Sequence, residues 1–269
     1  MIKSRRKGVA LMLALWLIVL LTVLGARVVS SSRSASGVAS NLRARMIGRY
    51  AAESGVALGA AVVRDSLARL TEPSDRASYL NSLEPESAQK SEAALSDERF
   101  SIVYVDVNSR LDVNNASQPQ LAKLFSYFVG PAEAMSASRS VRQWIDDGPD
   151  QSAPRGNVVA RSDLTYPRMP GARPLRTLEE LREINGVSER LAVAAAPYLT
   201  VDGDGRINRS SASDTVMSAA AGSLVDEPTR ILIVARGWLN GHPLTHEIQA
   251  VYGIEGNSLV LVRWQERDL

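Results

Sequence analysis

Closely spaced oxygen-bearing side chains are the clearest candidates for chemistry in this sequence. Asp202, Asp204 and Asn208 lie within seven residues and are interspersed with Gly203 and Gly205. Their spacing, with glycines that permit a tight turn, is similar to the start of a calcium-binding loop. No glutamate follows where an EF-hand places its bidentate ligand, so the loop is not an EF-hand. An Asp-Gly turn that caps the next helix is the alternative.

Other kinds of chemistry have few residues to support them. A second acidic cluster, Asp146, Asp147 and Asp150, is explained equally well by a solvated loop. The sequence has no cysteine, which excludes disulfides, thiolate zinc sites and cysteine nucleophiles. Its two histidines, His242 and His246, lie in a strand–turn region, where we expect exposed turn residues. Phosphate loops, nucleophile elbows and HExxH motifs are also missing. We therefore expect no enzymatic activity. A membrane-tethered periplasmic enzyme is the alternative interpretation.

The elements that position these residues begin with an apolar segment. Eleven basic and two acidic residues lie between Met1 and Leu70, so the rest of the 269-residue chain is net acidic. Val9 to Ala26 carries no charge. Its eighteen residues would span about 27 Å as a helix, close to the hydrocarbon thickness of a bilayer. Because cations precede this segment, we predict a cytoplasmic N-terminus and an exported remainder.

The short basic leader before the apolar segment ends in glycine. This order resembles the type IV prepilin processing signal, which implies that a membrane peptidase cuts between Gly8 and Val9 and that the new N-terminus is methylated. Most such proteins have glutamate five residues after the cut, whereas this chain has Leu13. Leu13 makes the resemblance to major pilins weaker and limits it to one minor subunit of pilin-like filaments. Ordinary signal cleavage after Gly25-Ala26 is the alternative.

Beyond the apolar segment, the sequence predicts that the same helix continues. Apolar residues recur every three or four positions, which places them on one stripe, and Pro73 ends the pattern. We expect the second half of the stripe to pack on the protein's own domain. The stripe consists of Leu42, Met46, Tyr50, Val56, Ala60, Val63, Leu67 and Leu70.

Alternating apolar residues predict strands near both ends of the remaining chain. They lie at 99–107, 230–238, 245–252 and 258–265, and turn sequences separate the last three. We expect an antiparallel meander with one face on the long helix. The polar stretch 73–95 is predicted to be a connection with room for a short helix.

Between these strand regions, the periodicity is helical. Helices are predicted at 118–128, 131–145, 177–184, 189–199 and 213–221, which indicates an insertion into an α+β domain. A weak repeat relates residues 111–117 to residues 207–213, each followed by a short helix that Asn or Ser side chains could cap.

One corner of this insertion suggests a different function. Residues 181–191 resemble a helix-hairpin-helix turn, which in other proteins holds DNA phosphates through backbone N–H groups. A membrane-anchored DNA-binding protein is therefore the rival interpretation. Charge argues against it, because residues 112–214 contain twelve basic and thirteen acidic side chains. We expect no binding of nucleic acid.

Taken in order, these features resemble the minor pseudopilin family of type II secretion known as general secretion pathway protein K. The resemblance covers nearly the whole chain and depends on the order of many short motifs. They are the glycine-ended leader, Leu13, 51–55 (AAESG), the helix at 112–121, 144–147 (WIDD), Tyr166-Pro167, 177–181 (TLEEL), Gly186-Val187, 197–201 (PYLTV) and 262–266 (VRWQE).

The resemblance implies a non-enzymatic, type IV pilin-like α+β fold with a large all-α insertion that contains the helix-hairpin-helix-like element. It divides the chain into a leader (1–8), a transmembrane part (9–29) and a periplasmic part (30–72) of a spine helix, an α/β domain (73–111 and 225–269) and the insertion (112–224).

The resemblance also implies a function and a location. The protein would be a single-pass inner-membrane protein with a periplasmic domain, at the tip of the pseudopilus. There it would start the filament and support the export of folded proteins across the outer membrane. Its partners would be the minor pseudopilins I, J and H and the prepilin peptidase. The family further implies bound calcium, for which Asp202, Asp204 and Asn208 are the candidate ligands.

Overall fold

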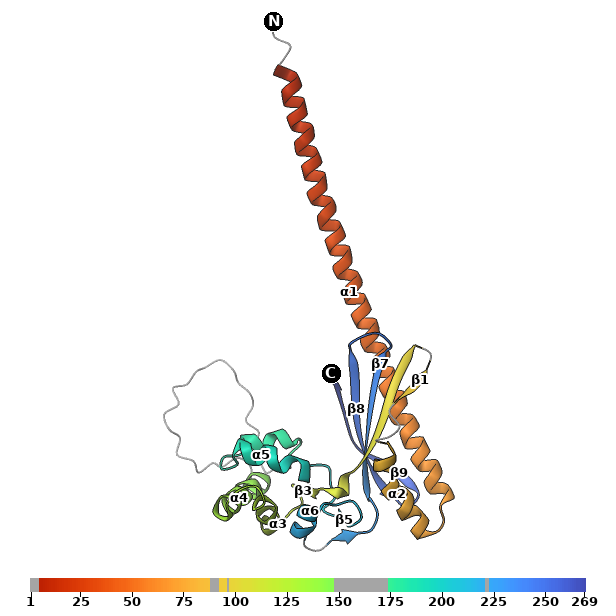
Figure 1. Cartoon of the computed structure of the whole chain (residues 1–269), viewed down its shortest axis with the longest axis vertical. Helices are drawn as coiled ribbons and strands as arrows, with labels where there is room; N and C mark the ends of the chain where they lie inside the picture. The colour runs from red at the N-terminus through yellow and green to blue at the C-terminus, as the bar shows by residue number, and fades with distance from the viewer. Residues whose placement is uncertain (1–4, 88–91, 96, 148–173, 221–222) are drawn as a thin grey trace.

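The computed structural model describes residues 5–87, 92–95, 97–147, 174–220 and 223–269, without the side chains of 5–11, 28–36, 94–95 and 147. A single long helix, α1 (Arg5–Arg69), begins the described chain; its first half stands clear of the other elements, and its second half lies along a sheet (Figure 1). Within these described residues, no helix combines the length and apolar character that a membrane span needs. Part of the span predicted at 9–29 lies outside the described side chains, and that span stays a prediction.

The sheet has five antiparallel strands in the order β1-β2-β7-β8-β9. Its four long strands occur where alternating apolar residues predict them, so the prediction of helices combined with an antiparallel sheet is confirmed. Gly241 and Gly256, in the turns that join the last three strands, have positive φ angles of 76° and 59°, which glycine adopts at little cost. The strands are β1 (Ala93–Leu95), β2 (Glu98–Asp106), β7 (Arg230–Leu239), β8 (Thr245–Glu255) and β9 (Ser258–Asp268).

α1 covers one face of this sheet, and small residues bring the two backbones together. A Cβ added to Gly237 would lie 2.2 Å from the carbonyl oxygen of Gly48, so neither helix nor strand has room for a side chain there. The second half of the predicted apolar stripe is buried against the sheet, as expected. Its buried members are Val56, Ala60, Val63 and Leu67, and they pack with Ile231, Ile233, Ala235, Ile248 and Ala250 of the sheet.

A second helix, α2 (Pro73–Ser87), replaces most of the polar connection predicted at 73–95. Its buried Leu80 and Leu83 join the core between α1 and the sheet. The helical signal in the sequence is weak here because serine, glutamate and an internal Pro85 obscure the spacing of the two leucines. The helix is longer than the short one for which the sequence leaves room.

The segment between β2 and β7 is mostly helical and has a hydrophobic core of its own, centred on Leu121, Leu124, Phe125 and Leu191. Figure 1 shows it beside the end of the sheet that is farther from the N-terminus. Its elements are η1 (Val107–Ser109), β3 (Leu111–Asp112), α3 (Gln118–Phe125), α4 (Pro131–Asp147), η2 (Leu178–Glu183), α5 (Glu189–Ala195), η3 (Ala196–Tyr198), β4 (Leu199–Thr200), β5 (Ile207–Asn208), α6 (Asp214–Ala219) and β6 (Leu224–Val225).

The weak sequence repeat is a repeat of structure. β3 and β5 each pair in parallel with another short strand, and each leads through a turn into a capped helix. The side-chain Oδ1 of Asp112 accepts from the N–H of Asn114, and that of Asn208 accepts from the N–H of Ser210. Ser117 and Ser213 cap the two helices, as the sequence predicts.

The predicted helix-hairpin-helix element is not confirmed. The helix expected at 177–184 is the 3-10 helix η2, so the corner joins one 3-10 turn to one α-helix. Gly186 forms this corner with a φ of 95°, and a Cβ on it would lie 2.8 Å from the hydroxyl oxygen of Ser140 on α4. The corner therefore packs against its own segment.

Candidate calcium loop and assembly surfaces

The predicted calcium loop lies where the helical segment meets the sheet, between β4 and β5. Asp204 uses both carboxylate oxygens there: Oδ1 accepts from Asn108 Nδ2 at 2.9 Å, and Oδ2 accepts from Thr229 Oγ1 at 2.8 Å. The Oδ1 of Asn108 in turn accepts from the backbone N–H groups of Thr229 and Arg230. Asp204 thus ties the loop to the residues that lead into β7.

Asn208 is fully buried and lies in the same junction. Its Nδ2 donates to Asp106 Oδ2 at 2.7 Å and to Asn81 Oδ1 at 2.8 Å, which links β5 to β2 and α2. Burial raises the pKa of Asp106, and hydrogen bonds from Ser211 and Asn208 oppose that rise. The Asn208 side chain thus connects the sheet to the helical segment.

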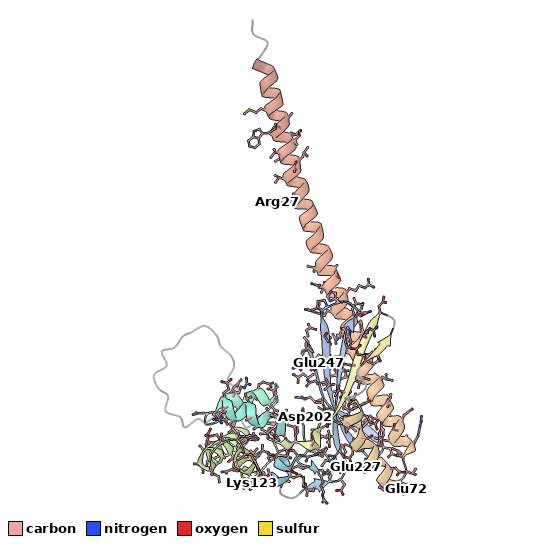
Figure 2. All side chains as sticks on the ribbon, viewed as in Figure 1. Arg27, Glu72, Lys123, Asp202, Glu227 and Glu247 are labelled. Carbon is pink, nitrogen blue, oxygen red and sulfur yellow. The ribbon has the colours of Figure 1, made fainter. Side chains whose placement is uncertain are left out.

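Asp202 points to different partners. Its Oδ2 lies 2.8 Å from Arg263 Nη2 of β9, and its main-chain oxygen accepts from Arg230 Nη1 at 2.6 Å. Figure 2 shows Asp202 where the helical segment meets the sheet. Burial raises the pKa of Asp202, and the charge of Asp112 adds to that rise, whereas Arg263 opposes it. The positive charge beside this loop is therefore supplied by two arginines.

These contacts test the loop as a calcium site. The three predicted ligands engage three separate sets of partners, and the carbonyl oxygens of Asp202 and Gly203 already accept from Arg230. No group of three or more His, Cys, Asp or Glu side chains that could hold a metal occurs in the described ranges. As arranged, Asp202, Asp204 and Asn208 do not fit one calcium ion, and no function below depends on the metal.

The second acidic cluster has a structural explanation where it is described. Asp146 forms an ion pair with Arg142 one turn earlier on α4, and Arg142 also donates to the main-chain oxygens of Asn114 and Ala116. Asp150 lies outside the described residues.

One of the two histidines contradicts the expectation of an exposed turn residue. His246 lies in β8 on the face that α1 covers, with 8% of its surface exposed. Its Nδ1 lies 2.8 Å from Asp268 Oδ1, and Asp268 also pairs with Arg45 of α1 at 3.2 Å. His246 therefore joins β8, β9 and α1. The alternation of β8, which also points Ile248 inward, could have placed it there.

An apolar ridge lies on α1 above the sheet. Val38, Leu42, Met46 and Tyr50 are spaced four residues apart, so their side chains form one row, and each is between 55% and 59% exposed. Leu42, Met46 and Tyr50 belong to the predicted stripe, but the sheet packs on the side of the helix that carries Ala44, Gly48 and Ala52, and the ridge lies on the other side. This apolar ridge is a surface suited to another protein.

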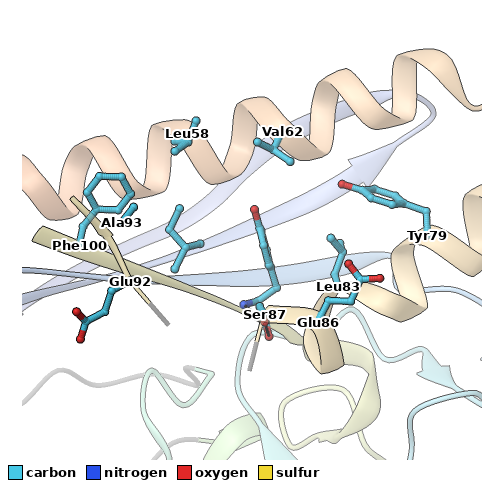
Figure 3. A pocket seen from close by; sticks show the side chains of 11 residues that line it. Leu58, Val62, Tyr79, Leu83, Glu86, Ser87, Glu92, Ala93 and Phe100 are labelled. Carbon is cyan, nitrogen blue, oxygen red and sulfur yellow. Dashed lines mark hydrogen bonds between the residues drawn. The ribbon is translucent and has the colours of Figure 1, made fainter. Parts of the chain in front are cut away.

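A groove of about 490 Å³ between α1, α2 and β2 is a further apolar surface (Figure 3). Leu58 and Val62 line it from α1, opposite Tyr79 and Leu83 of α2. Burial raises the pKa of Tyr104 in its wall to about 12, so the phenol stays protonated and donates to the main-chain oxygen of Gly59. The groove offers apolar contact area beside the ridge-bearing helix.

The predicted processing residues fall at the edge of the description. Gly8 and Val9 lie among the residues whose side chains are not described, whereas Leu13 is described and is 66% exposed. Cleavage between Gly8 and Val9 stays a prediction.

Comparison with known proteins relates these features to a protein family. Residues 80–203 match the family model described as type II secretion system (T2SS), protein K. This segment belongs to the protein K family. The match extends from α2 through β2 and most of the helical segment to the loop at Asp202, and it ends before Asp204 and Asn208. No curated protein matches the chain.

The fold of the protein K segment and of the elements around it is also known from a solved structure. A chain of the GspK-GspI-GspJ complex from the type 2 secretion system of enterotoxigenic Escherichia coli is similar, with a TM-score of 0.50 and 14% sequence identity. The match covers 81% of this chain and 98% of that one. At this identity, the likeness is one of fold.

Proposed function

We propose that this protein is a minor pseudopilin that assembles with pseudopilins I and J of its own type II secretion system. The apolar ridge on α1 is the observation that carries the proposal. Burying four exposed apolar side chains in a row against another helix would stabilise a complex by several kcal/mol, at roughly 25 cal/mol per Å² of apolar surface. The similar fold in a complex that contains GspI and GspJ supports this choice of partners.

The proposal includes a location for the protein. As an envelope-associated protein, it would be cut between Gly8 and Val9, methylated and held in the inner membrane by residues 9–29, with the sheet and helical segment in the periplasm. Leu13 replaces the glutamate that a typical pilin subunit carries at this position. The protein would therefore lie at the tip of the filament, above pseudopilin H, where it starts assembly and supports export. It would have no enzymatic activity.

The ridge can be tested by charge substitution. Leu42→Asp combined with Met46→Asp should lower co-purification of the full chain with pseudopilins I and J by at least tenfold, because two carboxylates would be desolvated in the contact. The matched control is Val193→Asp with Tyr127→Asp, since both residues are 53% exposed on the helical segment. Equal yields from the ridge variant and the wild type would contradict the proposal.

A further inference from the structure

The sheet has a second face, on the side away from α1. Phe100 and Ile102 of β2 and Ala235 of β7 point toward α1, where they surround Gly55. Because side chains alternate along a strand, Ser101, Val103 and their neighbours two residues away point to the opposite side. We call this side the outer sheet face. Its members on the four long strands are Arg99, Ser101, Val103, Val105, Leu232, Val234, Arg236, Trp238, Thr245, Glu247, Gln249, Val251, Arg263, Gln265 and Arg267.

The charges on the outer sheet face are unequal. Glu247 is fully buried in its centre, with its Oε2 2.6 Å from Arg236 Nε on β7 and its Oε1 2.6 Å from Arg267 Nη2 on β9. Burial alone would raise the pKa of Glu247, but hydrogen bonds from Arg236, Gln249 and Arg267 outweigh it and hold the pKa below its ordinary value. Glu247 thus stays ionised and orients two arginines whose side chains are 52% and 54% exposed.

The rest of the outer sheet face adds charge of the same sign around an apolar centre. Arg263 is paired with Asp202 of the helical segment. Without it, Arg99 brings the arginines to three against one buried carboxylate, and no lysine lies on the face. Val103, which is 37% exposed, pairs with Val234, and Trp238 is half-buried beside Arg99. Arginine and tryptophan around an apolar centre, with lysine and free carboxylates scarce, is the composition typical of a protein–protein interface.

We propose that the outer sheet face binds an acidic surface of a pseudopilin partner. The proposal rests on the proposed function, and it adds a contact on the side of the sheet that α1 does not cover. Glu247 holds Arg236 and Arg267 in place before binding, so little side-chain entropy is lost when they meet carboxylates. Three arginines beside one carboxylate would neutralise few phosphates, so the outer sheet face is poorly suited to duplex DNA.

A charge-reversal experiment tests the partner's chemistry. Arg99→Glu with Ser101→Glu reverses charge on the outer sheet face without replacing Glu247, Arg236 or Arg267. Arg69→Glu with Ser126→Glu is the control with the same change in net charge, at exposed positions on α1 and after α3. We expect the outer-face variant of the full chain to bind purified pseudopilins I and J about tenfold more weakly at low salt, with less difference at high salt, and the control to bind like the wild type.

Labelling keeps the test valid if the outer-face variant folds poorly. Because the chain has no cysteine, Ser101→Cys and Ser126→Cys each introduce one unique thiol. Pseudopilins I and J should slow maleimide labelling at position 101 several-fold and leave position 126 unchanged. Equal labelling with and without partners, while the complex forms, would overturn this proposal alone. Loss of every complex in the wild type would overturn the proposed function as well, and binding of DNA in place of pseudopilins would overturn both.

Discussion

Glu247 is a buried carboxylate whose arginine partners lie on the two neighbouring strands. Its pKa is held below the ordinary 4.5, so its ionised form stabilises the folded state above that pH, and this stabilisation is lost as pH falls through the lowered pKa. Glu247→Gln should therefore cost about 1–2 kcal/mol near neutral pH, since the arginines can still reach water. The difference from the wild type should shrink below about pH 4.

Urea unfolding at several pH values measures this difference. Glu255→Gln, an exposed residue on the same strand, is the control and should change stability by less than about 0.5 kcal/mol at every pH. A Glu247→Gln effect that does not change between pH 7 and pH 3.5 would show that the ion pairs are not its cause.

Asp204 accepts from Asn108 and Thr229, so its contribution does not require a metal. Asp204→Ala should lower stability by about 1 kcal/mol in EDTA, because it removes one of the two acceptors that each donor has. Thermal unfolding with and without calcium separates this role from the predicted calcium site. A calcium-dependent rise in Tm that Asp202→Ala with Asp204→Ala abolishes would support the site, whereas identical melting in calcium and EDTA would leave the loop as a structural junction.

At the scale of elements, the strands were predictable and the junction was not. Alternation along β7 and β8 depends only on residues a few positions apart, and it correctly gave both strands. The contact between Asn108 and Asp204 joins residues 96 positions apart, and nothing local distinguishes Asp204 from a metal ligand. The prediction that His246 is an exposed turn residue is wrong because it follows the turn sequence just before β8 and not the alternation within β8.

The packing of α1 on β7 gives a prediction at this scale. Gly237→Ala would place a Cβ 2.2 Å from the main-chain oxygen of Gly48 and 2.4 Å from the main-chain nitrogen of Ala52. Backbone atoms cannot turn aside as a side chain can, so the helix must move from the sheet, at a cost of about 1–3 kcal/mol or more. Urea unfolding of Gly253→Ala is the control, because its nearest contact would be an ordinary 3.6 Å to Val262 Cγ2. Equal losses for the two variants would contradict this account of the helix–sheet contact.

For the molecule as a whole, the long helix α1 has an exposed first part and a second part that packs on the sheet. Among the described side chains of α1, burial begins at Ala44, and the residues before it that are described are exposed. Of the residues before Ala44, those whose side chains are described take no part in the core of the sheet, α2 and the helical segment. They present surface that, as we propose, partners and the membrane cover.

A truncated protein tests this division. A chain that starts at Arg33 keeps every buried residue of α1 that the structure describes, so it should be soluble and should unfold in urea at the same midpoint as the full chain in detergent, within about 1 kcal/mol of unfolding free energy. It also keeps the apolar ridge, and we expect it to bind soluble pseudopilins I and J while showing no measurable binding to duplex DNA at physiological salt.

A chain that starts at Tyr50 is the control: it should lose partner binding, and it should lose some stability because Ala44 and the ion pairs of Arg45 and Arg49 are gone. If the Arg33 chain is unfolded, residues before it take part in the core. If it is folded but binds DNA and no pseudopilin, the protein serves a different function from the one proposed.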